Sequence, residues 1–271
     1  MSDIRSFAQH TLSPRAFHLV RYIRWQGKHY LPNKAASIFT RCAPVVTAYP
    51  SAKSNFADQI RAANLLAPTR MCRVMTWHGS DKGYVRHNYT AIYSRLFASR
   101  LHQPLRIFEL GLGTNNPALI SSMGEMGMPG ASLRGWRELF PRAQIYGADI
   151  DREILFHSDR IDTYYCDQLD ANAIRNLWAQ PALKGGMDII IDDGLHTFEG
   201  NVSFLEGSLR NLRRGGLYIV EDILNDSVRQ WHDYLAKTAP GFAPEFEFAF
   251  AELPNKFNHY DNNLLFIRRA A

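Results

Sequence analysis

The 271-residue sequence lacks several features that would assign it to common protein classes. It has three cysteines, an odd number without a CxxC pair, which argues against a disulfide framework and against a zinc site. Its apolar runs are far shorter than the roughly 20 residues that a membrane-spanning helix needs. The first ten residues lack the charged-then-apolar layout of a signal peptide. We therefore expect a soluble, cytoplasmic protein with reduced thiols and no transmembrane segment.

Long lysine and arginine runs, zinc fingers and aromatic RNA-binding signatures are also missing, so we expect no nucleic-acid partner. The net charge is nevertheless +5. Such an excess fits an anionic partner, for example a phosphorylated substrate or a membrane surface, or no specific partner. Much of it lies in the first hundred residues, where the segment 15–25 favours a basic helix packed on the protein's own core.

The chain divides into two regions with different patterns of expected secondary structure. Residues 1–100 look mainly helical and irregular, with several prolines, whereas residues 101–271 alternate strand-like and helix-like segments. This alternation predicts an α/β fold with a parallel, doubly wound sheet. Seven apolar segments are the expected strands: 106–110, 143–150, 162–166, 187–191, 216–220, 246–253 and 263–269. Ligands bind beyond the carboxyl ends of such strands, so the residues that follow each strand are the candidates for function.

A glycine-rich turn follows the first expected strand. It contains Glu109, Gly111, Gly113 and Thr114. The glycines let the backbone turn tightly and approach a ligand. The third glycine of a dinucleotide-binding fingerprint is missing, which argues against a nicotinamide-dependent oxidoreductase. An acidic residue before the first glycine is typical of S-adenosylmethionine-dependent methyltransferases, and a purely structural turn is the alternative.

Acidic and amide residues follow the second and third strands. Asp149 ends the second, where a carboxylate can accept both ribose hydroxyls of a nucleoside. The alternative is helix capping by Asp149 or Asp151. Asp167 and Gln168 end the third strand and are candidates to bond an adenine edge, while Asp170 is placed to cap the next helix.

Two acidic clusters follow the fourth and fifth strands. Asp192, Asp193 and His196 stand in one, and Glu221 and Asp222 form the other. Carboxylates that converge repel one another, and a bound divalent cation relieves the repulsion. Oxygen ligands favour Mg²⁺ or Mn²⁺ over zinc. Helix capping or arginine pairing would be the structural alternative. The histidine, with an ordinary pKa of about 6.5, can act as a base near neutral pH.

Several ordered motifs between about residues 77 and 269 together carry a family likeness. They are GSDKGYVRHNYTAIYSRLF, FELGLGT, ASLRGWRELFPRAQIYGADID, RIDTYYCDQLD, DIIIDDGLH and LRRGGLYIVEDI. This region resembles class I S-adenosylmethionine-dependent methyltransferases, and within them the metal-dependent sugar O-methyltransferases of macrolide and polysaccharide biosynthesis. The resemblance implies a Rossmann-like, seven-stranded sheet with a reversed last hairpin.

The resemblance also implies site residues. It places a catalytic base at His196 and ligands for Mg²⁺ or Mn²⁺ at Asp193, Glu221 and Asp222. The implied S-adenosyl-L-methionine site comprises Glu109, Gly111, Gly113, Thr114, Asp149, Asp167, Gln168 and Asp192. In this reading Asp192 either joins the cofactor site or only orients its neighbours. A family insert is matched, without an assigned role, by Ser132, Arg134 and Trp136.

The implied activity is Mg-dependent O-methylation of a sugar hydroxyl on a glycan, a glycoside or a nucleotide-activated precursor. A phosphorylated or other small-molecule acceptor is one alternative. Another is a non-catalytic, cofactor-binding partner in a biosynthetic complex, against which the intact acidic clusters argue. Leu195 stands where many relatives carry serine, which leaves the acceptor open. Relatives are often oligomers, so we expect residues 1–100 to be a substrate cover or a homo-oligomer interface.

Overall fold

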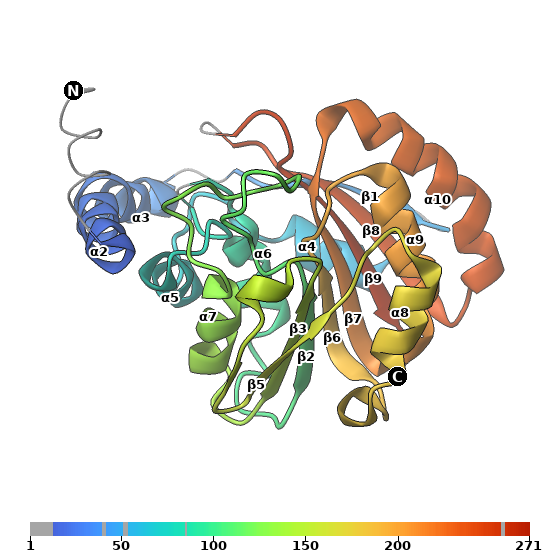
Figure 1. Cartoon of the computed structure of the whole chain (residues 1–271). Coiled ribbons are helices and arrows are strands. Elements are labelled where there is room, and N and C mark those ends of the chain that lie inside the picture. The colour runs from blue at the N-terminus through green and yellow to red at the C-terminus, as the bar shows by residue number, and fades with distance from the viewer. Residues whose placement is uncertain (1–12, 40–41, 51–53, 85, 256–257) are drawn as a thin grey trace.

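The computed structural model describes residues 13–39, 42–50, 54–84, 86–255 and 258–271 (Figure 1). One twisted sheet lies at its centre, with helices on both faces. The strands follow the order β1-β8-β9-β7-β6-β2-β3-β5-β4. Within the described residues, no helix is both long and apolar enough to cross a membrane.

The parallel part of the sheet holds five strands: β2 (Arg106–Leu110), β3 (Gln144–Asp149), β5 (Ile161–Tyr165), β6 (Met187–Asp192) and β7 (Leu212–Ile223). An antiparallel hairpin, β8 (Phe246–Glu252) and β9 (Asn263–Arg269), joins beside β7. All seven expected strands are therefore present, and the expected α/β class with a reversed last hairpin is confirmed.

Two further strands extend this sheet at its edges. β1 (Val45–Tyr49) pairs antiparallel with β8, and β4 (His157–Ser158) pairs antiparallel with β5. Along β1 the residues alternate between exposed Val45 and Thr47 and buried Val46 and Ala48, the period of a strand with one covered face. Five residues between prolines are a weak signal, which is why the sequence analysis did not find this strand.

The helices alternate with the strands from residue 131 onwards and dominate before residue 100. Their bounds are α2 (Pro14–Trp25), α3 (Leu31–Phe39), α4 (Asn55–Arg61), α5 (Arg70–His78), α6 (Tyr89–Leu96), α7 (Ala131–Leu139), α8 (Ala171–Trp178), α9 (Phe198–Ser208) and α10 (Val228–Phe242). A π-helical turn, Gln26–Tyr30, connects α2 to α3. Helix α5 begins at a capping box on Thr69 and ends at Gly79, whose φ of 92° suits a C-terminal glycine.

The core consists of two apolar layers, one on each face of the sheet. Ile189 and Ile191 of β6 face the layer formed with α4, α5, α6 and α7, whereas Ile190 faces the layer formed with α8, α9 and α10. A strand covered on both faces needs apolar residues at every position, which accounts for the unbroken isoleucine run. Figure 1 shows the two groups of helices on opposite sides of the strands.

Candidate active site at the carboxyl ends of the strands

The carboxyl ends of β2, β6 and β7 are neighbours, so the residues that follow them lie close together. Leu110 pairs with Asp192 across β2 and β6, and Asp192 pairs with Val220 across β6 and β7. The two acidic clusters of the sequence, which begin at Asp192 and Glu221, therefore meet at one edge of the sheet. The convergence expected from the sequence is present.

Asp193, His196 and Asp222 form one part of this cluster, in which Asp193 and His196 are half-buried and Asp222 is buried. Nε2 of His196 lies 3.3 Å from Oδ1 of Asp193 and 3.9 Å from Oδ2 of Asp222. One possible ligand atom from each residue lies within 4.8 Å of the others. His196 and Asp222 also have positive φ, 62° and 53°, a strained conformation that is uncommon outside functional sites.

Glu221 is placed differently from the other two predicted metal ligands. Its side chain is buried, and both of its carboxylate oxygens already accept hydrogen bonds. Tyr93 donates its hydroxyl to Oε1 at 2.5 Å, and Lys82 donates its ammonium to Oε2. The structure brings Asp193, His196 and Asp222 into one possible cation site and holds Glu221 behind them.

Lys82 is the functional candidate that the sequence analysis missed. It is buried, and its Nζ contacts Asp193 and Glu221 and lies 3.5 Å from Oε1 of Glu109. Tyr89, from the same segment, donates its hydroxyl to Oδ1 of Asp222 at 2.7 Å. The sequence contained two hints of this role: the GSDKGY motif, and two tyrosines four residues apart on one helix face. Neither hint indicates which carboxylates these side chains contact.

Burial and neighbouring charges shift the pKa values in this cluster in opposite directions. Burial would raise the pKa of Asp193, but Lys82 and His196 outweigh it and hold that pKa well below its usual range. Burial would lower the pKa of His196, but Asp222 and Asp193 outweigh it and raise the pKa to about 10. Burial raises the pKa values of Glu221 and Asp222. Asp193 is therefore ready to bind a cation as a carboxylate.

Glu109, expected at the cofactor site, is fully buried at the end of β2. Ser132 donates its hydroxyl to Oε1, and Trp136 donates its indole N–H to Oε2 at 2.5 Å. Both donors lie on α7, one turn apart, and together they fix the position of this carboxylate. Burial raises the pKa of Glu109, against the opposing effect of Lys82.

The glycine loop packs directly against the end of β6. Gly111 has a φ of 89°, and a Cβ atom there would overlap the backbone carbonyl of Asp193. The N–H of Asp193 donates to the carbonyl of Leu110 at 2.9 Å. Gly113, with a φ of 77°, packs against Met123. The loop therefore needs glycine at position 111 for close contact with the segment that carries Asp193.

Thr114 and Asp149 hold the loop in shape. Asp149 accepts the backbone N–H of Leu112 at 2.7 Å and that of Asp151 at 2.9 Å. Thr114 donates its hydroxyl to Asp151, which also caps the short helix Arg152–Ile154. The capping alternative is thus realised by Asp151, while Asp149 ties the second strand end to the glycine loop.

Gln168 and Asp192 form a buried, hydrogen-bonded pair beside the cluster of Asp193, His196 and Asp222. Nε2 of Gln168 donates to both oxygens of Asp192 at 2.9 Å, and its Oε1 accepts the N–H of Leu195 at 2.7 Å. Asn201 donates to Asp192 at 3.0 Å. Burial raises the pKa of Asp192 to about 7. This arrangement matches the alternative in which Asp192 orients its neighbours.

Asp167 is half-buried, in contrast to Gln168, and bonds the N–H of Leu169 at 2.9 Å. Asp170 caps α8 through the N–H of Asn172, as the sequence analysis expected. Apolar side chains stand exposed close to these strand ends. Ile150 follows β3 directly, and Leu169 follows Gln168; they are 44% and 58% exposed.

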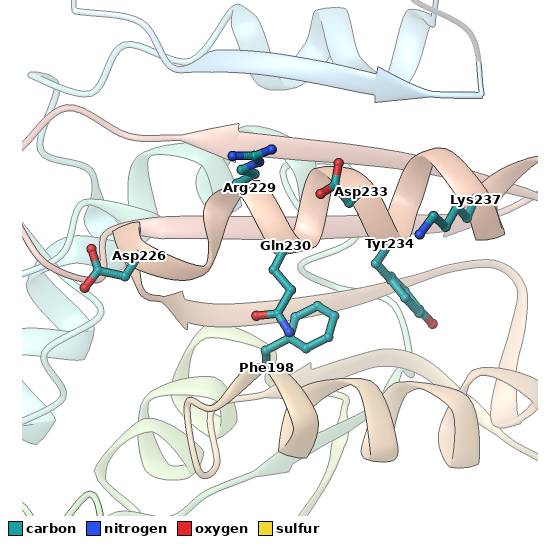
Figure 2. Close-up of a pocket in the computed structure, with 7 residues that line it drawn as sticks. All are labelled: Phe198, Asp226, Arg229, Gln230, Asp233, Tyr234 and Lys237. Atoms are coloured by element: carbon teal, nitrogen blue, oxygen red, sulfur yellow. The ribbon is translucent and has the colours of Figure 1, made fainter.

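A groove of about 520 Å³ lies between the start of α9 and the outer face of α10 (Figure 2). Phe198, two residues after His196, forms one wall and contacts Trp231 edge-to-face, with ring centroids 5.1 Å apart. Figure 2 shows Gln230 pointing toward Phe198. The lining residues are Phe198, Asp226, Arg229, Gln230, Asp233, Tyr234 and Lys237.

The fold is similar to that of Rossmann-like methyltransferases of known structure. The structure of MycE methyltransferase from the mycinamycin biosynthetic pathway, in complex with Mg and SAH, superimposes with a TM-score of 0.54 at 25% identity. The match covers 75% of this chain and 55% of MycE. No family model matches the chain.

The names of the curated relatives are those of O-methyltransferases that act on glycosylated compounds. The chain is 33% identical over 175 residues to 8-demethyl-8-(2-methoxy-alpha-L-rhamnosyl)-tetracenomycin-C 3'-O-methyltransferase of Streptomyces olivaceus. It is 35% identical over 137 residues to mycinamicin VI 2''-O-methyltransferase of Micromonospora griseorubida. These matches cover 62% and 51% of this chain but only 42% and 32% of the relatives. The resemblance expected from the sequence motifs is confirmed.

Proposed function

We propose that this chain is an S-adenosylmethionine-dependent, Mg²⁺- or Mn²⁺-dependent O-methyltransferase that acts on a sugar hydroxyl of a glycoside or glycan. The observation that carries the proposal is the convergence of Asp193, Asp222 and His196 beside the glycine loop. The names of the relatives, and the Mg and SAH in MycE, support the same reaction.

The donor set fits a divalent cation. Two carboxylates and an imidazole approach one point, and Asp193 is held in its ionised form. Carboxylate oxygen is the preferred ligand of Mg²⁺ and Mn²⁺. Glu221 would add a third carboxylate if the oxygen that it shares with Lys82 also faces the cation. We therefore keep Asp193, Glu221 and Asp222 as the proposed ligands, with His196 beside them.

The strand ends of β2, β3 and β5 fit the S-adenosyl group. The loop at Gly111 and Gly113 offers backbone close to the site, and exposed Ile150 and Leu169 offer apolar surface for a purine. Asp167 is accessible for a polar edge. In this proposal, direct contact belongs to the loop and Asp167. Other residues support the cofactor site indirectly, because their hydrogen bonds hold the glycine loop and the strand ends in place. They are Glu109, Thr114, Asp149, Gln168 and Asp192.

Methyl transfer moves a methyl group from the sulfonium to the acceptor oxygen and releases one proton. An imidazole nitrogen of His196 is the proposed acceptor of that proton, and its contacts with Asp193 and Asp222 orient the ring. A bound divalent cation would lower the pKa of an acceptor hydroxyl and offset the carboxylate charge that raises the pKa of His196. The glycine loop would hold the donor in line with the acceptor oxygen.

The groove between α9 and α10 fits a neutral glycoside better than a phosphorylated acceptor. Its lining carries two cations, Arg229 and Lys237, and two carboxylates, Asp226 and Asp233, so the charges balance. A phosphate site would require an excess of positive charge. An aromatic wall with polar side chains around it suits a sugar ring, which has both apolar faces and hydroxyl groups.

Location and assembly complete the proposal. The structure contains Cys42, Cys72 and Cys166 as free thiols, which suits a reducing cytoplasm. The sequence predicted a domain boundary near residue 100. Because β1 pairs with β8 and α4, α5 and α6 pack on the same sheet, we assign the residues from 42 onwards to the methyltransferase domain and propose α2 and α3 as a cover over the site or an oligomer interface. Exposed apolar residues on α2, such as Val20 and Ile23, would suit contact with a second copy.

The test is transfer of a labelled methyl group from S-adenosylmethionine to a panel of glycosides, with Mg²⁺ or with a chelator. We expect transfer that needs the cation. His196→Ala should lower kcat by about 10²–10⁴ and keep S-adenosylhomocysteine binding. His157→Ala is the matched control, because His157 is exposed and also pairs with a carboxylate, Asp162, at 3.1 Å. Transfer that resists the chelator, or full turnover by His196→Ala, would refute the mechanism.

A further inference from the structure

Three side chains between Lys82 and Tyr93 donate hydrogen bonds to Asp193, Glu221 and Asp222, which follow or end strands β6 and β7. We call Lys82, Tyr89 and Tyr93 the donor residues. All three are buried, and their partners are Asp193, Glu221 and Asp222. They lie outside the residues that the family motifs assign to the cation, the base or the cofactor.

Asp193 and Asp222 each have one oxygen bonded by a donor residue and the other oxygen near His196. Lys82 bonds Oδ2 of Asp193, and Oδ1 of the same residue lies 3.3 Å from Nε2 of His196. Tyr89 bonds Oδ1 of Asp222, and Oδ2 of that residue lies 3.9 Å from the same nitrogen. The backbone N–H of Asp222 also donates to the Tyr89 hydroxyl at 3.2 Å.

Tyr93 and Lys82 together hold Glu221. The phenol bonds Oε1 and the ammonium bonds Oε2, so Glu221 presents no oxygen without a donor. Tyr89 and Tyr93 stand four residues apart on α6, which places both phenols on one face of the helix. The backbone carbonyl of Asp261 lies 2.9 Å from the Tyr89 hydroxyl and is an alternative acceptor for its single proton.

We propose that Lys82, Tyr89 and Tyr93 are positioning residues that determine which carboxylate oxygens face the cation. This inference rests on the proposed function. An unrestrained carboxylate can rotate and offer either oxygen or both, whereas the donor on one oxygen of Asp193, and of Asp222, leaves the other oxygen to face the cation. The two donors on Glu221 fix its orientation. Lys82 also separates Asp193 from Glu221 with a buried positive charge, which limits their mutual repulsion. Residues that orient metal ligands in this way commonly change metal affinity by about 10–100-fold.

The test is Mn²⁺ affinity and its electron paramagnetic resonance spectrum, measured in the presence of S-adenosylhomocysteine. Tyr89→Phe and Tyr93→Phe remove one hydroxyl each, and Lys82→Met removes the ammonium. Tyr218→Phe is the matched control, because Tyr218 is buried on β7 but its hydroxyl bonds no described residue. Thermal unfolding identifies any variant that does not fold. If Lys82→Met does not fold, Tyr89→Phe and Tyr93→Phe still test the proposal.

We expect Tyr89→Phe to bind Mn²⁺ about 10–100-fold more weakly than Tyr218→Phe, with an altered spectrum. Tyr93→Phe should change in the same direction, and S-adenosylhomocysteine affinity should stay within about twofold in both. Mn²⁺ affinity and spectra equal to those of Tyr218→Phe would overturn the inference while leaving the proposed function intact. If the unmodified protein binds the nucleoside but no Mn²⁺, the proposed cation site fails, and the inference with it.

Discussion

Replacing Gly111 with alanine should separate the cost of backbone strain from the cost of close contact at the site. Gly111 and Gly185 have nearly equal φ, 89° and 91°. A side chain in this left-handed region costs about 1–2 kcal/mol at either position. The surroundings differ, because a Cβ at Gly185 would meet only the Arg213 side chain at 3.8 Å, whereas one at Gly111 would overlap the Asp193 backbone.

The expected losses of stability follow from this difference. Gly185→Ala should lower the free energy of unfolding by about 1–2 kcal/mol, from strain alone. Gly111→Ala should lose about 2–5 kcal/mol, because overpacking against a fixed backbone adds about 1–3 kcal/mol. For a chain of roughly this size, each kcal/mol corresponds to about 2–4 °C in Tm. Relief of the overlap must also displace Asp193, so cation and nucleoside binding should fall in this variant alone.

Urea unfolding and calorimetric titration with S-adenosylhomocysteine, each with and without Mg²⁺, measure both effects. The unmodified protein and Gly185→Ala should bind alike. If the free energy of unfolding falls equally in the two variants, the close contact between the glycine loop and the end of β6 does not contribute to stability. If Gly111→Ala also binds both ligands normally, Asp193 does not depend on the loop, and the reasoning about this site is wrong.

Two further predictions concern buried side chains. Trp136→Phe should destabilise the protein about 1–2 kcal/mol more than Trp178→Phe in urea unfolding, because the first donates to the buried carboxylate of Glu109 and the second to the neutral hydroxyl of Ser208. Equal losses would show that Glu109 does not rely on its indole donor. Burial raises the pKa of Cys166 to about 12, so roughly one thiol in ten thousand is ionised at pH 8. Because the thiolate is the reactive form, iodoacetamide should modify Cys166 slowly, and the rate should rise about tenfold per pH unit. Rapid modification at pH 8, read by mass spectrometry of the folded protein, would contradict that burial.

The sequence predicted the parts of the fold that depend on local pattern. Strands such as β6 and β7 are continuous apolar runs, which are recognisable in the sequence. Because ligands bind at the carboxyl ends of such strands, the sequence also predicted that Asp193, His196 and Asp222 lie close together. The reversed hairpin of β8 and β9 was implied by the family resemblance and not by local pattern. A short edge strand, β1, escaped because five alternating residues in a helical region carry little signal.

The sequence could not predict which polar residues would partner one another. Asp149 and Gln168 stand where nucleoside contacts were expected, yet the structure uses them to tie strand ends together. Lys82 is separated from Asp193 by 111 residues, and Tyr93 from Glu221 by 128. Contacts at that separation depend on how α6 packs on the sheet, and periodicity carries no information about it.

The measurement that tests the central claim most directly is calorimetric titration of the unmodified protein with S-adenosylhomocysteine, in Mg²⁺ and in a chelator. We expect saturable binding to one site per chain. A separate titration should show Mn²⁺ binding that is lost in Asp193→Ala while nucleoside binding persists. No nucleoside binding by a protein that unfolds cooperatively would contradict the account, because the glycine loop and strand ends would then serve another ligand or none.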